Sequence, residues 1–199
     1  MSERPPVLLV HGIWDTGAKL DVLRAGLVRA GLSPVHTIDL APNDGRAPIP
    51  DLARQVRDRA RDILRIHGAA RLDLVGFSMG ALVSRYFVQR LGGRELVRRF
   101  VSVSGPHGGT AMAAFHPAWF RGVHDMRPGS ALLRELASDP DPWGGVEVHV
   151  IYTPYDLMIV PARSSELPGA RSTTRLPMPL HRLMIVHPRA VAAVATKLR

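Results

Sequence analysis

The pentapeptide Gly76-Phe77-Ser78-Met79-Gly80 is the stretch whose residue types and spacing could do chemistry. It follows a short apolar run, 72–75, that is typical of a buried strand, and it precedes a helical pattern of apolar residues. A G-x-S-x-G pattern between a strand and a helix is typical of a sharp turn that exposes a nucleophilic serine. Glycines on both sides of Ser78 would remove clashes in so tight a turn. The alternative is an ordinary strand–turn–helix connection with an incidental serine.

A serine hydroxyl needs a neighbouring base to act as a nucleophile, usually a histidine that a carboxylate orients. In the fold that uses this turn, the chain order is serine, acid, histidine. Asp156 is the predicted acid because it follows the expected strand 146–152, although an aspartate that merely forms a turn is the alternative. His181 is the predicted base, since it lies just past the expected last strand. His187 precedes Pro188 and fits the entry to a final helix instead.

Other carboxylates and histidines fit these two roles less well. Asp139 and Asp141 lie before the strand 146–152, at its wrong end, and Asp125 and Glu166 are weaker rivals. His107 precedes Asp156, so the chain order argues against it as the base. The remaining histidines after the first strand have no spacing that suggests a metal site, and we expect neither a metal nor a cofactor: His36, His67, His116, His124 and His149.

The developing negative charge of an acyl-transfer reaction needs two backbone N–H donors, an oxyanion hole. The first predicted donor is the N–H of Met79, directly after the serine. The second is the N–H of Ile13, because Gly12 lets the backbone approach closely after the first expected strand. We expect the side chain of His11 to order this loop rather than to react.

Strands and helices alternate along the chain. Unbroken apolar runs predict buried strands, and helical spacing of apolar residues predicts amphipathic helices between them. The pattern predicts an α/β fold with a doubly wound, mostly parallel sheet of about six strands flanked by helices, with the ligand beyond the carboxyl ends of the strands. The expected strands are 7–10, 35–40, 72–75, 100–104, 146–152 and 171–176, and the main helices are 18–30, 51–67, 79–90, 130–137 and 188–198.

Length and composition bound the class of protein. The 199 residues, 46% of them hydrophobic, predict one domain over 1–199. The absence of cysteine excludes a disulfide framework and a thiolate nucleophile. No run is long enough to span a membrane, and the start of the chain leaves no room for a signal peptide, so we expect a cytoplasmic protein. The net charge of +9 comes from scattered arginines, so no nucleic-acid partner is expected, whereas contact with an anionic lipid surface stays open.

Taken together, these segments resemble the α/β-hydrolase lipases and esterases, particularly small bacterial lipases without a cap domain. The matching segments are 10–13, 76–80, 105–110, 156–160 and 180–184, in the right order over most of the chain. The resemblance implies a minimal α/β-hydrolase fold and hydrolysis of carboxylic esters through an acyl-serine intermediate, without a cofactor. It also places the histidine of the triad at 181. Leu180 departs from the small residue that often precedes this histidine.

Two other functions remain open at this point. An acyltransferase or a thioesterase would use the same triad, and a non-catalytic protein of this fold could use its charge for binding. A small acyl ester or a lipid is the expected substrate, and segment 105–128 supplies candidate acyl-pocket residues or a short lid: Met112, Phe115, Trp119 and Phe120. The alternative is that these side chains fill the core. The expected sheet and helices take up nearly all of the 199 residues, which leaves little chain to cover the site. We therefore expect hydrolysis of soluble short- and medium-chain esters without a lipid interface.

Overall fold

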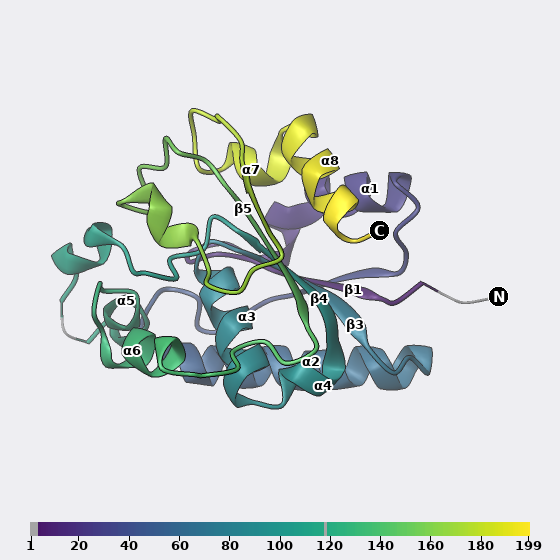
Figure 1. Cartoon of the computed structure of the whole chain (residues 1–199), viewed down its shortest axis with the longest axis horizontal. Helices are drawn as coiled ribbons and strands as arrows, with labels where there is room; N and C mark the ends of the chain where they lie inside the picture. The colour runs from purple at the N-terminus through teal and green to yellow at the C-terminus, as the bar shows by residue number, and fades with distance from the viewer. Residues whose placement is uncertain (1–3, 118) are drawn as a thin grey trace.

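Six parallel strands form the sheet at the centre of the molecule (Figure 1). The computed structural model describes residues 4–117 and 119–199, so the first three residues and position 118 of segment 105–128 lie outside the described residues. The strand order is β2-β1-β3-β4-β5-β6, and every neighbouring pair is parallel. The bounds are β1 Val7–Val10, β2 Val35–Ile38, β3 Leu72–Phe77, β4 Val97–Val103, β5 Glu147–Tyr152 and β6 Ser172–Arg175.

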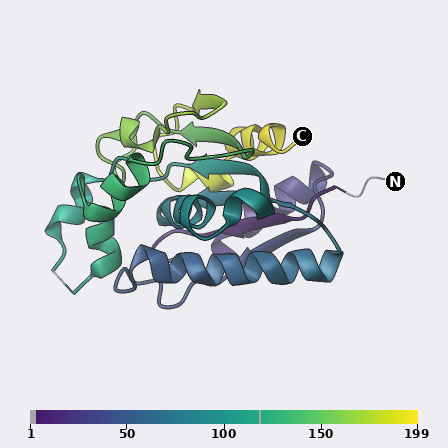
Figure 2. The ribbon, with the colours of Figure 1, turned by 60° about the horizontal axis from the view of Figure 1, so that its bottom comes forward.

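Helices cover both faces of this sheet, which makes it doubly wound and confirms the predicted class (Figures 1 and 2). On one face, α2 (Ile49–His67) packs beside α3 (Met79–Arg90). On the other face, α1 (Asp21–Arg29) contacts α7 (Leu183–Val186) and α8 (Pro188–Lys197). The shorter helices are η1 Gly17–Leu20, α4 Gly93–Leu96, η2 Ala111–Phe115, α5 Arg121–Asp125, α6 Ala131–Ala137 and η3 Ala162–Ser165.

Strand β1 is apolar throughout because each side of the sheet has its own core. Side chains alternate between the two faces of a strand, so Leu8 and Val10 join the cluster under α2 and α3, whereas Val7 and Leu9 join the cluster under α1 and α8. All four are fully buried. Parallel strands that are covered on both sides read as unbroken hydrophobic runs, which is the pattern that the sequence shows.

Residues at the ends of three helices explain where those helices begin or end. Helix α1 ends in a Schellman motif, in which Gly31 has a φ of 79° and the N–H of Leu32 donates to the carbonyl of Leu27. Ser130 caps α6 by accepting from the N–H of Leu133 at 3.2 Å. Pro188 occupies the first turn of α8, as expected.

Several boundaries differ from the sequence expectations. Strand β2 stops at Ile38, because the N–H of Leu40 bonds to a side chain instead of a neighbouring strand. Helix α2 starts two residues earlier than predicted, since Asp125 accepts from the N–H of Ile49 and caps it from a distant segment. On α2, Asp62 pairs with Arg65, three residues later, whereas Asp58 pairs with its neighbour Arg57. Within the described residues, no helix combines the length and the apolar character that crossing a membrane requires.

Candidate active site

Ser78 lies between the end of β3 and the start of α3 in a strained backbone conformation, with φ 55° and ψ −127°. This region costs energy for a residue with a side chain, and it persists only where the surroundings hold it. The N–H of Ser78 donates to the carbonyl of Val103 on β4. A Cβ at position 76 would lie 2.5 Å from Ala81 Cα, and one at position 80 would lie 2.3 Å from the carbonyl oxygen of His11. The glycines on both sides are therefore needed for the turn, as the sequence predicts.

A buried carboxylate orients a histidine at the same end of the sheet. The Nδ1–H of His181 donates to Asp156 Oδ2 at 2.7 Å. The other oxygen of Asp156 accepts from the backbone N–H groups of Met158 and Ile159, at 2.9 and 3.0 Å. These bonds hold a carboxylate that is only 5% exposed, and they leave the Nε2 of His181 free. That nitrogen has no hydrogen-bond partner within the described chain, and its ring lies 4.7 Å from the ring of Phe77, beside Ser78.

The rival residues are engaged elsewhere. His187 Nδ1 accepts from the N–H of Arg189 and caps α8. Glu166 accepts from the hydroxyl of Tyr152 and from Arg175, and Asp125 caps α2. These contacts are structural, so the structure brings Asp156 and His181 together and keeps the alternatives apart from Ser78.

His107 is buried on the far side of β4 from this pair. Its Nε2 shares a 2.7 Å hydrogen bond with the hydroxyl of Ser102. Burial, and then the nearby Arg85, lower the pKa of His107 well below its ordinary value, so this ring is neutral. The guanidinium of Arg85 donates to the carbonyls of His107 and Leu136, and burial lowers its pKa to about 10. Arg85 thereby connects α3 to loop 105–110 and to α6. No local pattern in the sequence indicates this role.

The loop after β1 brings the second expected N–H donor near Ser78. His11 donates from Nδ1 to the carbonyl of Gly12 and accepts at Nε2 from the N–H of Leu40, so its side chain orders the loop. A Cβ at Gly12 would lie 3.0 Å from Ser78 Cβ, which shows how closely this backbone approaches the serine. Among the hydrogen bonds of residues 4–117 and 119–199, none uses the N–H of Ile13 or of Met79.

Two cavities meet at Ser78. The first, here called the apolar cavity, has a volume of about 50 Å³. The second, the charged cavity, has a volume of about 180 Å³ and also contacts His181. The apolar cavity is lined by Ile13, Trp14, Ser78, Thr110, Met112, Ala113, His116, Val123, Met126, Met158 and Ile159. The charged cavity is lined by Ile13, Trp14, Asp15, Lys19, Phe77, Ser78, Met158, His181, Arg182 and Ile185.

The four predicted acyl-pocket residues lie in different surroundings. Met112 lines the apolar cavity, whereas Phe120 packs against the core beside His116. Phe115 and Trp119 are 82% and 68% exposed and line neither cavity. Trp14 and Met158 line both cavities and were not among the residues predicted from the sequence. Their position in loops after β1 and β5, at the carboxyl ends of strands, is the signal that would have found them.

Several exposed apolar side chains belong to segments at the same end of the sheet as these cavities, and three of them line a cavity: Trp14, Met112 and Met158. Most of the large hydrophobic residues that are exposed on the described surface belong to segments that follow the carboxyl ends of β1, β4, β5 and β6. We call this set the apolar rim: Trp14, Met112, Phe115, Trp119, Tyr155, Leu157, Met158 and Leu180. In the described parts of the chain, no group of three His, Cys, Asp or Glu side chains is arranged to hold a metal ion.

One protein family matches most of this chain. The sequence profile of the family described as palmitoyl protein thioesterase matches residues 6–139. A triacylglycerol lipase from Pseudomonas fragi is 32% identical over 118 residues, which are 57% of this chain and 38% of that protein. The chain therefore spans well under half the length of that curated relative.

Solved structures share the whole fold. Aspergillus fumigatus lipase B superposes with a TM-score of 0.84 at 18% identity, over 98% of this chain and 52% of that one. The mature form of Bacillus licheniformis lipase BlEst2 superposes with a TM-score of 0.81 at 16% identity, over 100% of this chain and 93% of that one. The chain has the α/β-hydrolase fold of lipases and esterases, as its motifs predict.

Proposed function

Because the chain belongs to the palmitoyl protein thioesterase family, we propose that it hydrolyses acyl esters with Ser78 as nucleophile, His181 as base and Asp156 as the acid that orients it. One observation carries this proposal. The 2.7 Å bond from His181 Nδ1 to Asp156 leaves Nε2 without a partner in the described chain, at the cavity that Ser78 also lines. A neutral imidazole in this tautomer can accept the hydroxyl proton of a serine.

The reaction then proceeds in two balanced halves. Ser78 Oγ attacks the carbonyl carbon while its proton passes to His181 Nε2, and the carbonyl electrons move to the oxygen. The bond to the leaving group breaks as the leaving atom takes that proton, which releases an alcohol or a thiol and leaves an acyl-serine. Water then gives a proton to the same histidine and attacks the acyl-serine. The bond to Ser78 Oγ breaks as that proton passes to the serine oxygen, which releases the carboxylic acid and the free enzyme.

The N–H groups of Ile13 and Met79 are the proposed donors to the oxyanion of both tetrahedral intermediates. Their support is the close approach of the Gly12 backbone to Ser78 and the lack of another acceptor for either group in the described chain. Donors that are fixed before the reaction stabilise the developing charge without reorganisation. Phe77 and His181 line the charged cavity beside Ser78.

Hydrolysis of thioesters is a second candidate within the same chemistry. The family match, whose description names a palmitoyl protein thioesterase, favours it over acyl transfer to an alcohol. The triad accepts either leaving atom, because His181 protonates oxygen or sulfur from the same position. Matched hexanoyl esters and thioesters of one small alcohol and its thiol analogue, compared by kcat/KM, decide which bond the site prefers.

Replacement of the nucleophile tests the proposal. Ser78→Ala removes only the hydroxyl and keeps the two glycines that the turn needs, so circular dichroism should be unchanged. We expect kcat to fall by a factor on the order of 10⁴ to 10⁶, as in related triads. A variant that retains more than a few per cent of the parent activity on every ester would instead support a non-catalytic role for this site.

A further inference from the structure

The two cavities at Ser78 differ in their access to His181. The charged cavity contacts both residues, whereas the apolar cavity contacts Ser78 alone. In the proposed reaction, the leaving atom takes its proton from His181 Nε2, and a proton donor must lie within hydrogen-bond reach of the atom it protonates. The leaving group therefore occupies the charged cavity. The acyl chain occupies the apolar cavity, whose walls include Met112, Val123 and Met126.

Two cations line the leaving-group side without an acidic partner. Lys19 belongs to η1, and Arg182 directly follows His181. Neither forms an ion pair or a side-chain hydrogen bond with any described residue, although many other arginines of this chain pair with carboxylates, such as Arg24 with Asp21. Asp15 is the only acid among the lining residues, so the formal charge around the cavity is positive.

We propose that the charged cavity binds a leaving group that carries an oxyanion, a carboxylate or a phosphate, close to the bond that breaks. This inference rests on the proposed function, and it names the substrate class of the same site. Lys19 and Arg182 would attract the anion, and Arg182 could bind it through two parallel N–H donors. A cavity of about 180 Å³ holds only a small leaving group, so the anion lies within a few bonds of the scissile carbonyl.

A matched set of substrates tests the charge preference. Hexanoyl esters of meta-hydroxybenzoate, of meta-hydroxyphenyl phosphate and of meta-hydroxybenzamide share an acyl chain and a ring and differ in the charged group. Partly screened ion pairs are worth roughly threefold each, so two cations predict kcat/KM about tenfold higher for the anionic esters than for the neutral amide. The carboxylate and phosphate arms show which oxyanion the site prefers.

Variants assign the preference to the two cations. The double variant Lys19→Gln, Arg182→Gln should bring the ratio of anionic to neutral kcat/KM close to one. The charge-retaining double variant Lys19→Arg, Arg182→Lys should keep most of it, and Asp15→Asn should raise it. Arg189→Gln removes an exposed arginine of α8 that lines neither cavity and should leave the ratio unchanged.

The outcomes separate this inference from the function on which it rests. A preference for either anionic ester that disappears in the double glutamine variant supports it. Turnover of the neutral ester with no preference for either anionic ester would overturn the inference and leave the proposed hydrolysis intact. A preference that survives the double glutamine variant would have the same consequence. Failure to turn over any of the three esters would overturn both. Product inhibition gives a second readout, since meta-hydroxybenzoate should inhibit more strongly than meta-hydroxybenzamide.

Discussion

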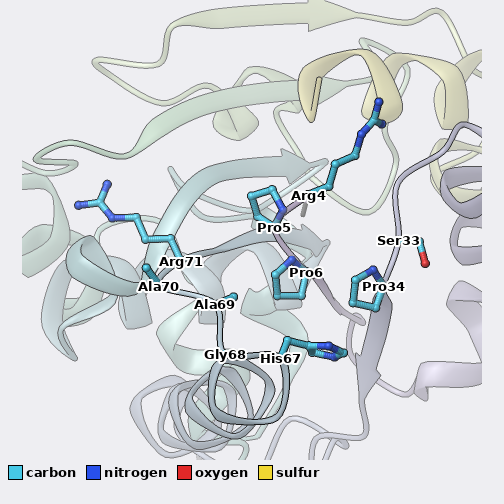
Figure 3. A pocket seen from close by; sticks show the side chains of 10 residues that line it. All are labelled: Arg4, Pro5, Pro6, Ser33, Pro34, His67, Gly68, Ala69, Ala70 and Arg71. Carbon is cyan, nitrogen blue, oxygen red and sulfur yellow. The ribbon is translucent and has the colours of Figure 1, made fainter. Parts of the chain in front are cut away.

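The two ends of the sheet both carry a cavity, and the larger cavity is at the end without the serine. At the amino end, about 640 Å³ lie open between the start of the chain and the end of α2 (Figure 3). Its walls are mainly proline, glycine and alanine, and its two arginines point in different directions, Arg4 donating to the carbonyl of Gly31. The lining residues are Arg4, Pro5, Pro6, Ser33, Pro34, His67, Gly68, Ala69, Ala70 and Arg71.

The cavities at the carboxyl end of the sheet are smaller than the one at the amino end, and hydrogen bonds hold the side chains beside them in place. There, Ser78 is held at a positive φ, and a buried carboxylate orients His181. Under the proposed function, volume is a poor guide to the reactive site of this molecule. Strained backbone and pre-arranged hydrogen bonds mark it, because catalysis depends on groups that are already in position.

The largest expected effect separates the two late histidines. His181→Ala removes the proposed base, and kcat should fall by a factor on the order of 10⁴ to 10⁶. His187→Ala removes a cap at the start of α8 and should change kcat by less than about threefold, because this residue lies outside both cavities. Steady-state rates on one ester provide the measurement. A severe loss only in the His187 variant would reverse the assignment.

A second pair of variants adds one methyl group at each end of the sheet. In Gly12→Ala, the new Cβ would lie 3.0 Å from Ser78 Cβ, so displacement of the serine should lower kcat by up to about 10²-fold. In Gly68→Ala, nothing lies within 4 Å of the new Cβ, but φ is 61°. That variant should lose about 1 kcal/mol of unfolding free energy and keep its kcat. Equal losses of kcat in both variants would contradict the assignment of the site to one end.

The apolar rim leads to a smaller expected effect. Lipid enzymes that are activated at an interface expose an apolar patch when a lid opens, whereas here Phe115, Trp119 and Leu157 are already exposed. Initial rates plotted against substrate concentration should therefore saturate smoothly through the solubility limit. A sharp rise when droplets appear would instead indicate that segment 105–128 acts as a lid, against the expectation from the sequence.

The smallest effect concerns pH and the amino end. His36 and His67 share a 2.8 Å contact between their Nε2 atoms, so at least one ring is neutral. Burial, and then His67, lower the pKa of His36 below 6.5, so the unfolded chain binds this proton more tightly than the folded chain does. The free energy of unfolding should therefore fall as the pH drops below about 6.5. His36→Gln should make the dependence of the unfolding free energy on pH shallower without changing kcat. An unchanged pH dependence in this variant would contradict the assignment of the effect to His36.

The sheet and its main helices could be predicted because their signals are local. Apolar runs such as 7–10, the spacing of buried residues in α2, and caps such as Ser130 each depend on a few neighbouring residues. The start of α2 could not be predicted, since its cap, Asp125, comes from a segment far along the chain. Helix α4 lacked a clear pattern because it has only one turn.

The candidate site was predictable to the extent that motif and chain order define it. Ser78, Asp156 and His181 follow from a turn pattern and from the order of the elements, and their functional roles stay a prediction. The residues that line the cavities are harder to predict from the sequence. The segment that contains Phe115 and Trp119 has no periodicity that would tell an inward side chain from an exposed one, and both side chains are exposed. Trp14 and Met158 meet only after the loops of β1 and β5 fold together.

Labelling with a fluorophosphonate tests the central claim most directly, because the probe reacts only with a serine that a neighbouring base activates. After brief exposure of the wild-type protein, mass spectrometry of its peptides should find one adduct, on Ser78. The His181→Ala variant should label at least 10²-fold more slowly, since its serine lacks the base. Absence of labelling in the wild type, or an adduct at a serine other than Ser78, would contradict the account.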